Sequence, residues 1–189
     1  MKYERDNFAN LFALRQYGPF LRERGTTTIP PATGEEPFFS SCEPYYQTLI
    51  DLARRYVTPS SICLDIGCGP GRLVGEFSRL GSALSIGIDT SFKMTQLAQT
   101  ILTSATSVNI ELRCNFGVAN TRAFEVRAWG LSNVRLVRSS AEALPLGTAQ
   151  ADLVCCANVL TRLRRPVTAL GEIRRVLKPG GAVAGVVGM

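Results

Sequence analysis

The residues best suited to chemistry lie between Asp65 and Asp89, where three glycines alternate in the run D-I-G-C-G-P-G. Gly67, Gly69 and Gly71 can adopt positive φ angles, and without side chains they let a ligand approach the backbone closely. A helix that begins after them would present unpaired N–H groups and a partial positive charge to an anion. Asp89 could accept hydrogen bonds from both hydroxyls of a ribose. The chemistry indicated is the binding of a ligand that contains a ribose.

A strand, a loop, a helix and a second strand must position these residues. An apolar run at 61–64 predicts the first strand, and 84–88 predicts the second, with Asp89 at its carboxyl end. Four apolar residues between them recur at helical spacing: Leu73, Val74, Phe77 and Leu80. A dinucleotide-binding loop uses the same physics, but counted from Gly67 its third glycine would stand at Arg72. The dinucleotide fingerprint therefore fails.

The run D-I-G-C-G-P-G, with a second acid after the next strand, resembles the first motif of class I S-adenosylmethionine-dependent methyltransferases of the small-molecule, type 11 branch. The resemblance covers about residues 61–187 apart from one insertion. It implies a Rossmann-like, doubly wound, mainly parallel α/β sheet, with S-adenosyl-L-methionine as cofactor and a small molecule as methyl acceptor. It places Asp65 and the loop at 67–71 against the methionine end, and Asp89 against the ribose. The cofactor-binding residues that it implies are Asp65, Gly67, Cys68, Gly69, Gly71, Asp89, Thr90, Ser140, Ala141, Glu142 and Asn158.

Two later segments depart from the pattern that this family shows. S-S-A-E-A-L-P-L resembles the segment at the adenine, but Ser140 stands where an acid is common, and a hydroxyl accepts less strongly than a carboxylate. After the expected strand at 151–157, Thr161 and Arg162 stand where many relatives carry a histidine pair. We therefore expect weakened cofactor affinity and assign no catalytic residue.

Composition excludes several classes of function. A chain of 189 residues fits one domain, and its lack of histidine argues against a metal site. Six cysteines without a C-x-x-C pair fit buried, reduced thiols. The charged start is unlike a signal peptide, and no apolar run is long enough for a membrane span, so we expect a cytoplasmic protein. The net charge of +6 lies entirely in 111–189, which fits a solvated surface or an acidic partner.

We expect residues 1–60 to form a helical cap over a domain at 61–189. One helix would carry Phe8, Leu11, Phe12 and Arg15, and a second would begin at Glu43 with Tyr46, Leu49, Ile50, Ala53 and Val57 on one face. Aromatic residues are concentrated before residue 57. These aromatic residues have two possible roles: they line the acceptor pocket, or they pack the N-terminal helices onto the sheet. The weak candidates for acceptor binding are Phe38, Phe39, Tyr45, Tyr46 and Arg162.

Residues 104–133 read as an insertion that forms a hairpin or a cap. V-N-I-E-L-R alternates as a strand does, whereas 119–129 could be helical, and Arg113, Arg122 and Arg127 would make the insertion basic. A helix at 166–177, a K-P-G-G turn and a fifth strand follow. The last two strands of the family fold have no counterpart in the sequence, which fits a truncated form. We therefore expect a homodimer or a partner chain to cover the edge of strand five.

Two other functions stay open at this stage. A methyltransferase-like binding or regulatory module without turnover would fit the departures noted above. An RNA methyltransferase would fit the basic half, although nucleic acid is the less favoured partner because no N-P-P-Y-type motif follows strand four. RNA affinity that weakens steeply with salt would favour that function.

Overall fold

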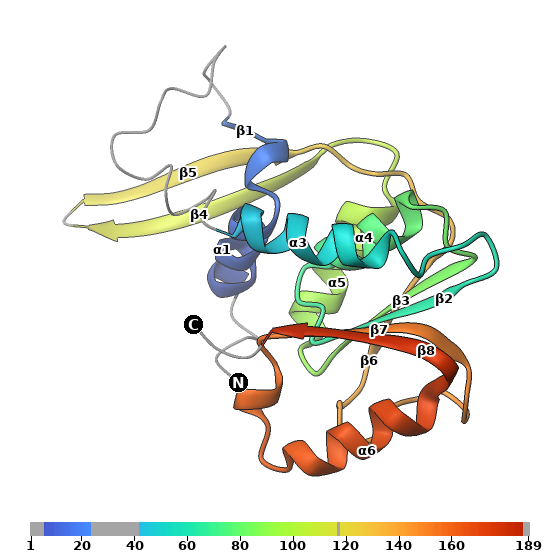
Figure 1. Ribbon diagram of the computed structural model, residues 1–189. Helices are drawn as coiled ribbons and strands as arrows, with labels where there is room; N and C mark the ends of the chain where they lie inside the picture. Colours follow the sequence, from blue (N-terminus) through green and yellow to red (C-terminus); the bar gives the residue numbers. More distant parts are fainter. Residues whose placement is uncertain (1–5, 24–41, 117, 187–189) are drawn as a thin grey trace.

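A parallel five-stranded sheet forms the centre of the protein. The computed structural model describes residues 6–23, 42–116 and 118–186 (Figure 1). Adjacent strands of the sheet are parallel, in the order β6 (Val134–Arg138), β3 (Leu84–Asp89), β2 (Ile62–Ile66), β7 (Ala151–Ala157) and β8 (Leu177–Val186). The first strand of the sheet therefore lies at its middle, which confirms the Rossmann-like, mainly parallel fold class.

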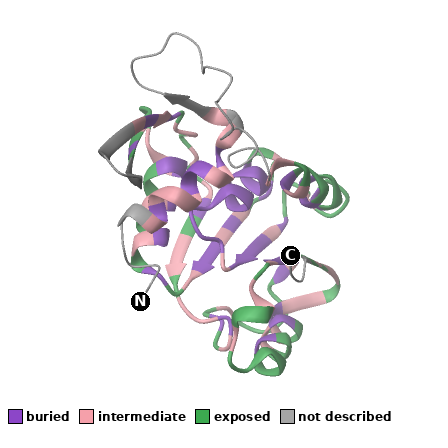
Figure 2. Cartoon of the chain, turned by 90° about the vertical axis from the view of Figure 1, so that its left-hand side faces the viewer, coloured by how far each residue is buried: buried purple, intermediate pink, exposed green. Residues whose placement is uncertain are grey.

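Helices cover both faces of this sheet, and its central strands are therefore buried. Helices α3 (Glu43–Ala53), α4 (Arg72–Arg79) and α5 (Phe92–Thr103) lie on one face, and α6 (Pro166–Val176) lies on the other (Figure 1). The sides of the helices that face the sheet are buried, whereas the outer turns are exposed (Figure 2). Strands that are covered on both faces have nearly continuous apolar sequences. The run L-V-C-C in β7 is of this kind.

The insertion forms a second sheet with the N-terminal segment. Strands β4 (Val108–Phe116) and β5 (Val118–Val126) form an antiparallel hairpin, and β1 (Leu21–Glu23) pairs with β5. The predicted strand at 108–113 is confirmed, but the predicted helix over 119–129 is wrong. Phe124 and Val126 alternate with Glu125 and are buried, so the local period is that of a strand.

Helix α1 (Asp6–Gln16) forms where the sequence predicts it, but a different face is buried. Ala13 and Leu14 are fully buried with Tyr17, whereas Phe8 and Phe12 are only half-buried and pack against each other. Alanine permits a close approach between α1 and β4. A short 3-10 helix, η2 (Gly18–Phe20), then leads into β1.

Trp129 joins the insertion to the central layer. A Cβ atom on Gly75 of α4 would lie 2.5 Å from the Trp129 ring and 2.6 Å from Leu102. The ring also makes edge contacts with Tyr17 and Phe20, at centroid distances of 5.7 and 5.4 Å. Trp129 therefore fills the space between α1, η2 and α4.

The K-P-G-G segment bulges out of β8 instead of preceding the strand. Leu177 pairs with Ala151, and Ala182 pairs with Leu153, so residues 178–181 stand opposite a single residue of β7. Lys178 Nζ bonds both carboxylate oxygens of Asp152 there, at 2.9 and 2.8 Å.

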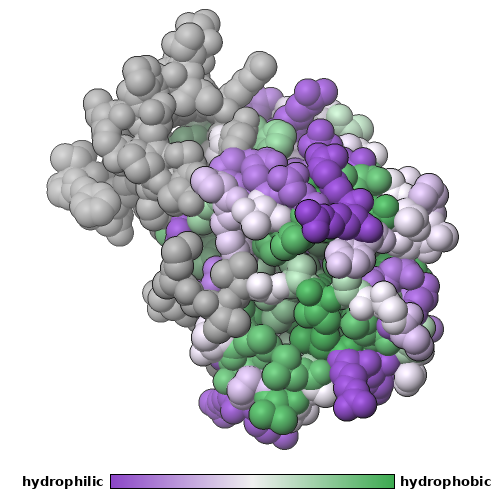
Figure 3. All heavy atoms as spheres, viewed as in Figure 1, coloured by the Kyte–Doolittle hydropathy of each residue, from purple (hydrophilic) through white to green (hydrophobic). Residues whose placement is uncertain are grey.

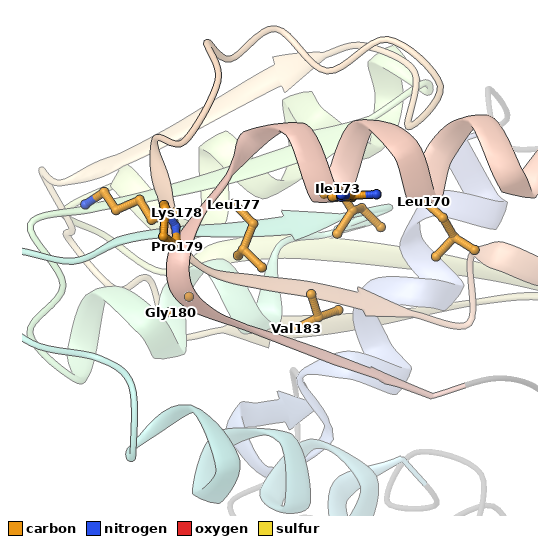
Figure 4. Close-up of a pocket in the computed structure, with 9 residues that line it drawn as sticks. Leu170, Ile173, Leu177, Lys178, Pro179, Gly180 and Val183 are labelled. Carbon is orange, nitrogen blue, oxygen red and sulfur yellow. The ribbon is translucent and has the colours of Figure 1, made fainter.

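An open apolar groove of about 510 Å³ lies between α6 and β8, at the edge of the described sheet. Leu170, Ile173 and Leu177 project toward Val183 of β8 (Figure 4). Hydrophobic residues gather over this part of the surface (Figure 3). The partner expected at this edge stays a prediction.

Substitution of Gly75 by alanine tests the packing of Trp129. The new methyl group would collide with the indole ring, so we expect Gly75→Ala to lower the free energy of unfolding by about 1–3 kcal/mol. Gly171 is the matched control, because it lies in α6 with nothing within 4 Å of its Cβ position. There the same change should stabilise by about 0.5–1 kcal/mol. Urea denaturation measures both, and equal stabilisation by the two variants would contradict the packing.

Candidate functional site

The glycine loop lies between β2 and α4, at the carboxyl end of the central strand. Gly67, Gly69 and Gly71 have φ angles of 69°, 53° and 89°, in the left-handed region that favours glycine. The backbone N–H groups of Gly67 and Cys68 donate to Ile88 O at 2.7 and 3.0 Å, which ties the loop to β3. The loop therefore has a fixed shape at the edge where parallel sheets bind ligands.

The three glycines are needed for different reasons. A Cβ atom on Gly67 would lie 2.1 Å from Val159, and one on Gly71 would lie 2.9 Å from Ala98. These two positions are small because neighbouring side chains pack against them. A Cβ atom on Gly69 would meet only the amide of Gln16, at 3.1 Å. Gly69 is therefore the position where the loop can admit a ligand.

Asp89 is oriented at the end of β3 by two backbone donors. Its Oδ2 accepts a hydrogen bond from Gly69 N at 3.0 Å, and its Oδ1 accepts one from Ser91 N at 2.9 Å. Ser91 also caps α5, since its hydroxyl accepts a hydrogen bond from Met94 N at 3.3 Å. The carboxylate is thus held beside Gly69, and its role in ribose binding stays a prediction.

Asp65 is a buried carboxylate without a cationic partner among the described residues. It is the residue before the last in β2, it is 3% exposed, and no hydrogen bond or ion pair between the described residues reaches its carboxylate. Burial raises the pKa of this carboxyl well above its usual range, and the nearby charge of Asp89 raises it further. A buried anion of this kind is costly unless a positive charge pairs with it. The site therefore fits a ligand that carries a cation.

Neutral phenols and thiols surround Asp65. Burial raises the pKa of Tyr45, Tyr46, Cys68 and Cys155, and it raises the pKa of Cys156 to about 11. None of these groups is ionised near neutral pH, so none supplies a nucleophilic thiolate or a general base. The Tyr45 hydroxyl is buried and has no hydrogen-bond partner among the described residues.

Two residues that sequence reasoning missed, Gln16 and Tyr17, lie against the glycine loop. The Tyr17 hydroxyl donates to Pro70 O at 3.0 Å. Gln16 Oε1 accepts a hydrogen bond from Arg72 N at 3.3 Å, and Gln16 O accepts one from Arg72 Nη1 at 3.1 Å. Gln16 ends a helix more than fifty positions before the loop, and no local motif marks its role.

Arg72 connects three helices behind the loop. Its side chain is 1% exposed, its Nε donates to Glu76 Oε1 at 2.9 Å, and its Nη2 donates to Glu43 Oε1 at 3.3 Å. Its guanidinium lies 4.5 Å from the centre of the Phe20 ring. In the sequence, Arg72 is distinguished only because it occupies the position of the third glycine of a dinucleotide-binding loop.

The remaining residues expected at the cofactor lie around this centre. The Ser140 hydroxyl accepts a hydrogen bond from Glu142 N at 3.1 Å, and the Glu142 carboxylate accepts one from Arg165 Nε at 2.8 Å. Ser139 N donates to Asp89 O at 3.0 Å, which brings this segment beside β3. Four others differ in exposure: the side chains of Cys68 and Ala141 are in the core, whereas Thr90 and Asn158 are exposed.

The residues expected at the acceptor are spread more widely. Tyr45 and Tyr46 lie on α3 near Asp65, and Arg162 is exposed at the end of a 3-10 helix, η3 (Leu160–Arg162). Phe38 and Phe39 lie outside the described residues. A second open groove lies between α1, α5 and β4, and neither it nor the groove at α6 is at the glycine loop. The candidate site is therefore defined by the two carboxylates and Gly69 and not by either groove.

A parallel α/β sheet with a glycine loop after its central strand, and an acid near the carboxyl end of each of two adjacent strands, has the architecture in which open α/β sheets bind nucleotide-like ligands. A family model described as a methyltransferase domain matches residues 64–185. The chain therefore belongs to the methyltransferase domain family. Within the part of the chain that the structure describes, no helix is long and apolar enough to cross a membrane.

Curated relatives and solved structures agree with this family. An uncharacterized 37.1 kDa protein in transposon TN4556 of Streptomyces fradiae is 30% identical over 187 residues, which cover 90% of this chain and 46% of that protein. A malonyl-[acyl-carrier protein] O-methyltransferase of Marinomonas is 28% identical, covering 70% of this chain and 40% of the relative. The YcgJ protein of Bacillus subtilis has the same fold, with a TM-score of 0.57 at 23% identity, over 75% of this chain and 50% of that one. The chain spans about half the length, or less, of these proteins.

Arg72→Met tests whether the buried guanidinium holds the helices together. The change removes the guanidinium donors to Glu76, Glu43 and the Gln16 carbonyl, so we expect a loss of about 3–5 kcal/mol in the free energy of unfolding. Arg79→Met is the control, because Arg79 is half-exposed and 3.8 Å from Glu76. It should cost about 1 kcal/mol or less. Similar losses for both variants would contradict the role given to Arg72.

Asp65→Asn tests the unpaired buried carboxylate. Because burial raises the pKa of Asp65 above the value of about 3.9 of an unfolded aspartate, the folded state holds this proton more tightly. The stability that the protonated Asp65 carboxyl contributes is fully present below about pH 4, and it is lost as the pH rises through the raised pKa. Asp65→Asn should therefore raise the melting temperature of the ligand-free protein near neutral pH and flatten that part of the pH profile.

Asp152→Asn is the comparison variant, because the pKa of Asp152 is shifted in the opposite direction from that of Asp65. Thermal unfolding of both variants is measured across the same pH range. Partial burial alone would raise the pKa of Asp152, but hydrogen bonds from Lys178 and Ile62 N outweigh it and hold the pKa below its usual value. This variant should lower the melting temperature near neutral pH. A lower melting temperature for Asp65→Asn as well would mean that Asp65 is stabilised by a partner.

Proposed function

We propose that this chain binds S-adenosyl-L-methionine and transfers its methyl group to a small-molecule acceptor. The observation that carries the proposal is the buried Asp65 carboxylate, which has no cationic partner among the described residues and lies beside the glycine loop. When bound, S-adenosylmethionine supplies an activated methyl group on a positively charged sulfur. Its amino-acid end also carries an ammonium group, which an ionised Asp65 would pair with.

The other residues of the site have separate roles in this proposal. Gly69 admits the ligand to the backbone, and Asp89 binds the ribose hydroxyls. Ser140 and Glu142, with the backbone of Ala141, lie toward the adenine. Gly67, Cys68 and Gly71 shape the loop, and Thr90 and Asn158 line its rim. Membership of the methyltransferase domain family supports this assignment.

The acceptor is expected to be nucleophilic without help from a base. Methyl transfer by direct displacement needs alignment of the acceptor and exclusion of water. The raised pKa values of Tyr45, Tyr46 and Cys156 keep these groups neutral, so none would remove a proton from the acceptor. An amine, a thiolate or an already ionised oxygen therefore fits better than a phenol. The Tyr45 hydroxyl is left to donate a hydrogen bond to the acceptor.

A binding module without turnover is the second candidate function. Ser140 in place of the acid common at the adenine, and Thr161 and Arg162 in place of a histidine pair, favour this function. Tight binding of S-adenosylhomocysteine without methyl transfer to any acceptor in a screen would identify this function.

We also propose a cytoplasmic location. Four cysteines in the described part of the chain, Cys63, Cys68, Cys155 and Cys156, are buried and form no disulfide with one another. A reducing compartment keeps such thiols unpaired.

Calorimetric titration with S-adenosylmethionine and S-adenosylhomocysteine tests the proposed function directly. We expect both to bind, and Asp89→Ala to weaken binding by about 1.5–3 kcal/mol because charge-assisted hydrogen bonds to the ribose are lost. Asp51→Ala is the control, since Asp51 lies on the exposed face of α3 and should leave the affinity unchanged. Absence of binding by the folded protein would reject the proposal, and an unchanged affinity of Asp89→Ala would reject the assignment of Asp89.

A further inference from the structure

Gln16 lies on the only glycine of the loop that is open to a ligand. Its Nε2 is 3.1 Å from the position that a Cβ atom on Gly69 would occupy. By contrast, Gly67 and Gly71 are covered by the aliphatic side chains of Val159 and Ala98. The group that meets a ligand above Gly69 is therefore a carboxamide from the N-terminal helix α1.

The orientation of this carboxamide is set by the start of α4. Gln16 Oε1 accepts a hydrogen bond from Arg72 N, which is one of the N–H groups that a helix N-terminus leaves unpaired. The opposite orientation of the amide would place two donors against each other. Arg72 Nη1 also donates to the Gln16 carbonyl, so both the backbone and the side chain of Gln16 are held.

The fixed amide directs an available donor toward Gly69. The bonds between Gln16 and Arg72 use only the Oε1 atom and the carbonyl oxygen of Gln16. Gln16 Nε2 donates no hydrogen bond to another described residue. The guanidinium of Arg72 does not compete for an anion there, since Glu76 and Glu43 pair with it. An acceptor above Gly69 would thus meet the amide N–H group and the positive end of α4.

The site then has two polar ends that suit an amino acid. The buried Asp65 carboxylate suits the ammonium group, and Gln16 Nε2 suits the carboxylate. A nucleoside without an amino-acid chain would leave both groups without a partner, and unmatched buried polar groups oppose binding.

We propose that Gln16 recognises the carboxylate of the ligand's amino-acid end, which makes the site selective for S-adenosyl amino acids over adenine nucleosides that lack this end. The inference rests on the proposed function and adds a specificity residue to it.

Titration calorimetry with two ligands tests this role. S-adenosylhomocysteine carries the amino-acid end, whereas 5′-methylthioadenosine shares its adenosine and thioether but lacks that end. Gln16→Met keeps the length of the side chain over Gly69 and removes the donor. We expect this variant to bind S-adenosylhomocysteine about tenfold more weakly and to bind 5′-methylthioadenosine as the wild type does.

Gln99→Met is the matched control, because Gln99 is exposed on α5 and bonds only Thr103 nearby. It should change neither affinity. Equal weakening of both ligands by Gln16→Met would show that Gln16 only supports the loop, and an unchanged affinity for S-adenosylhomocysteine would also overturn the inference; both results leave the proposed function standing. Failure of the folded wild-type protein to bind either ligand would overturn the proposed function together with this inference.

Discussion

The buried guanidinium of Arg72 is the interaction on which the arrangement of the site depends. Removing an arginine from water is costly, and the cost is offset only by well-placed acceptors. Glu76, Glu43 and the carbonyl of Gln16 provide these acceptors, and they come from α4, α3 and α1. The Phe20 ring covers the remaining face of the guanidinium. Because the three helices meet at one charge, the end of α1 lies against the start of α4 and the glycine loop.

A second buried charge, that of Asp65, is left unbalanced within the described protein. Asp152 shows how the same residue type is stabilised elsewhere, with Lys178 and a backbone N–H group as partners. The difference lies in position, because Asp65 lies near the end of the central strand that leads into the glycine loop, whereas Asp152 lies near the opposite end of the neighbouring strand. A functional site can retain such a locally unfavourable group where a ligand completes it. The absence of a cationic partner for Asp65 among the described residues therefore explains both its unfavourable burial and its proposed selectivity for a cation.

Local sequence was a good guide where the structure is local. The strands predicted at 61–64 and 84–88 are observed as β2 and β3, and the helical spacing of Leu73, Val74 and Phe77 is observed in α4. The helix predicted over 119–129 was wrong, because the decisive contact of β5 is its pairing with β4 and β1. The K-P-G-G turn became a bulge because Leu177 already pairs with Ala151. In both cases pairing between strands outweighed local propensity.

The sequence by itself determined the class of the protein, since the spacing of Asp65, the glycines and Asp89 is a property of one continuous segment. It also excluded histidine chemistry, because the chain has no histidine. Only the tertiary structure decided which glycine has no aliphatic side chain against it, which carboxylate has no partner among the described residues and which distant residue lies over the loop. Gln16 and Gly69 are separated by most of the N-terminal segment, and α1 reaches the loop through the bonds of Arg72. Contacts of this range depend on the packing of whole helices, and no periodicity or motif in the chain encodes them.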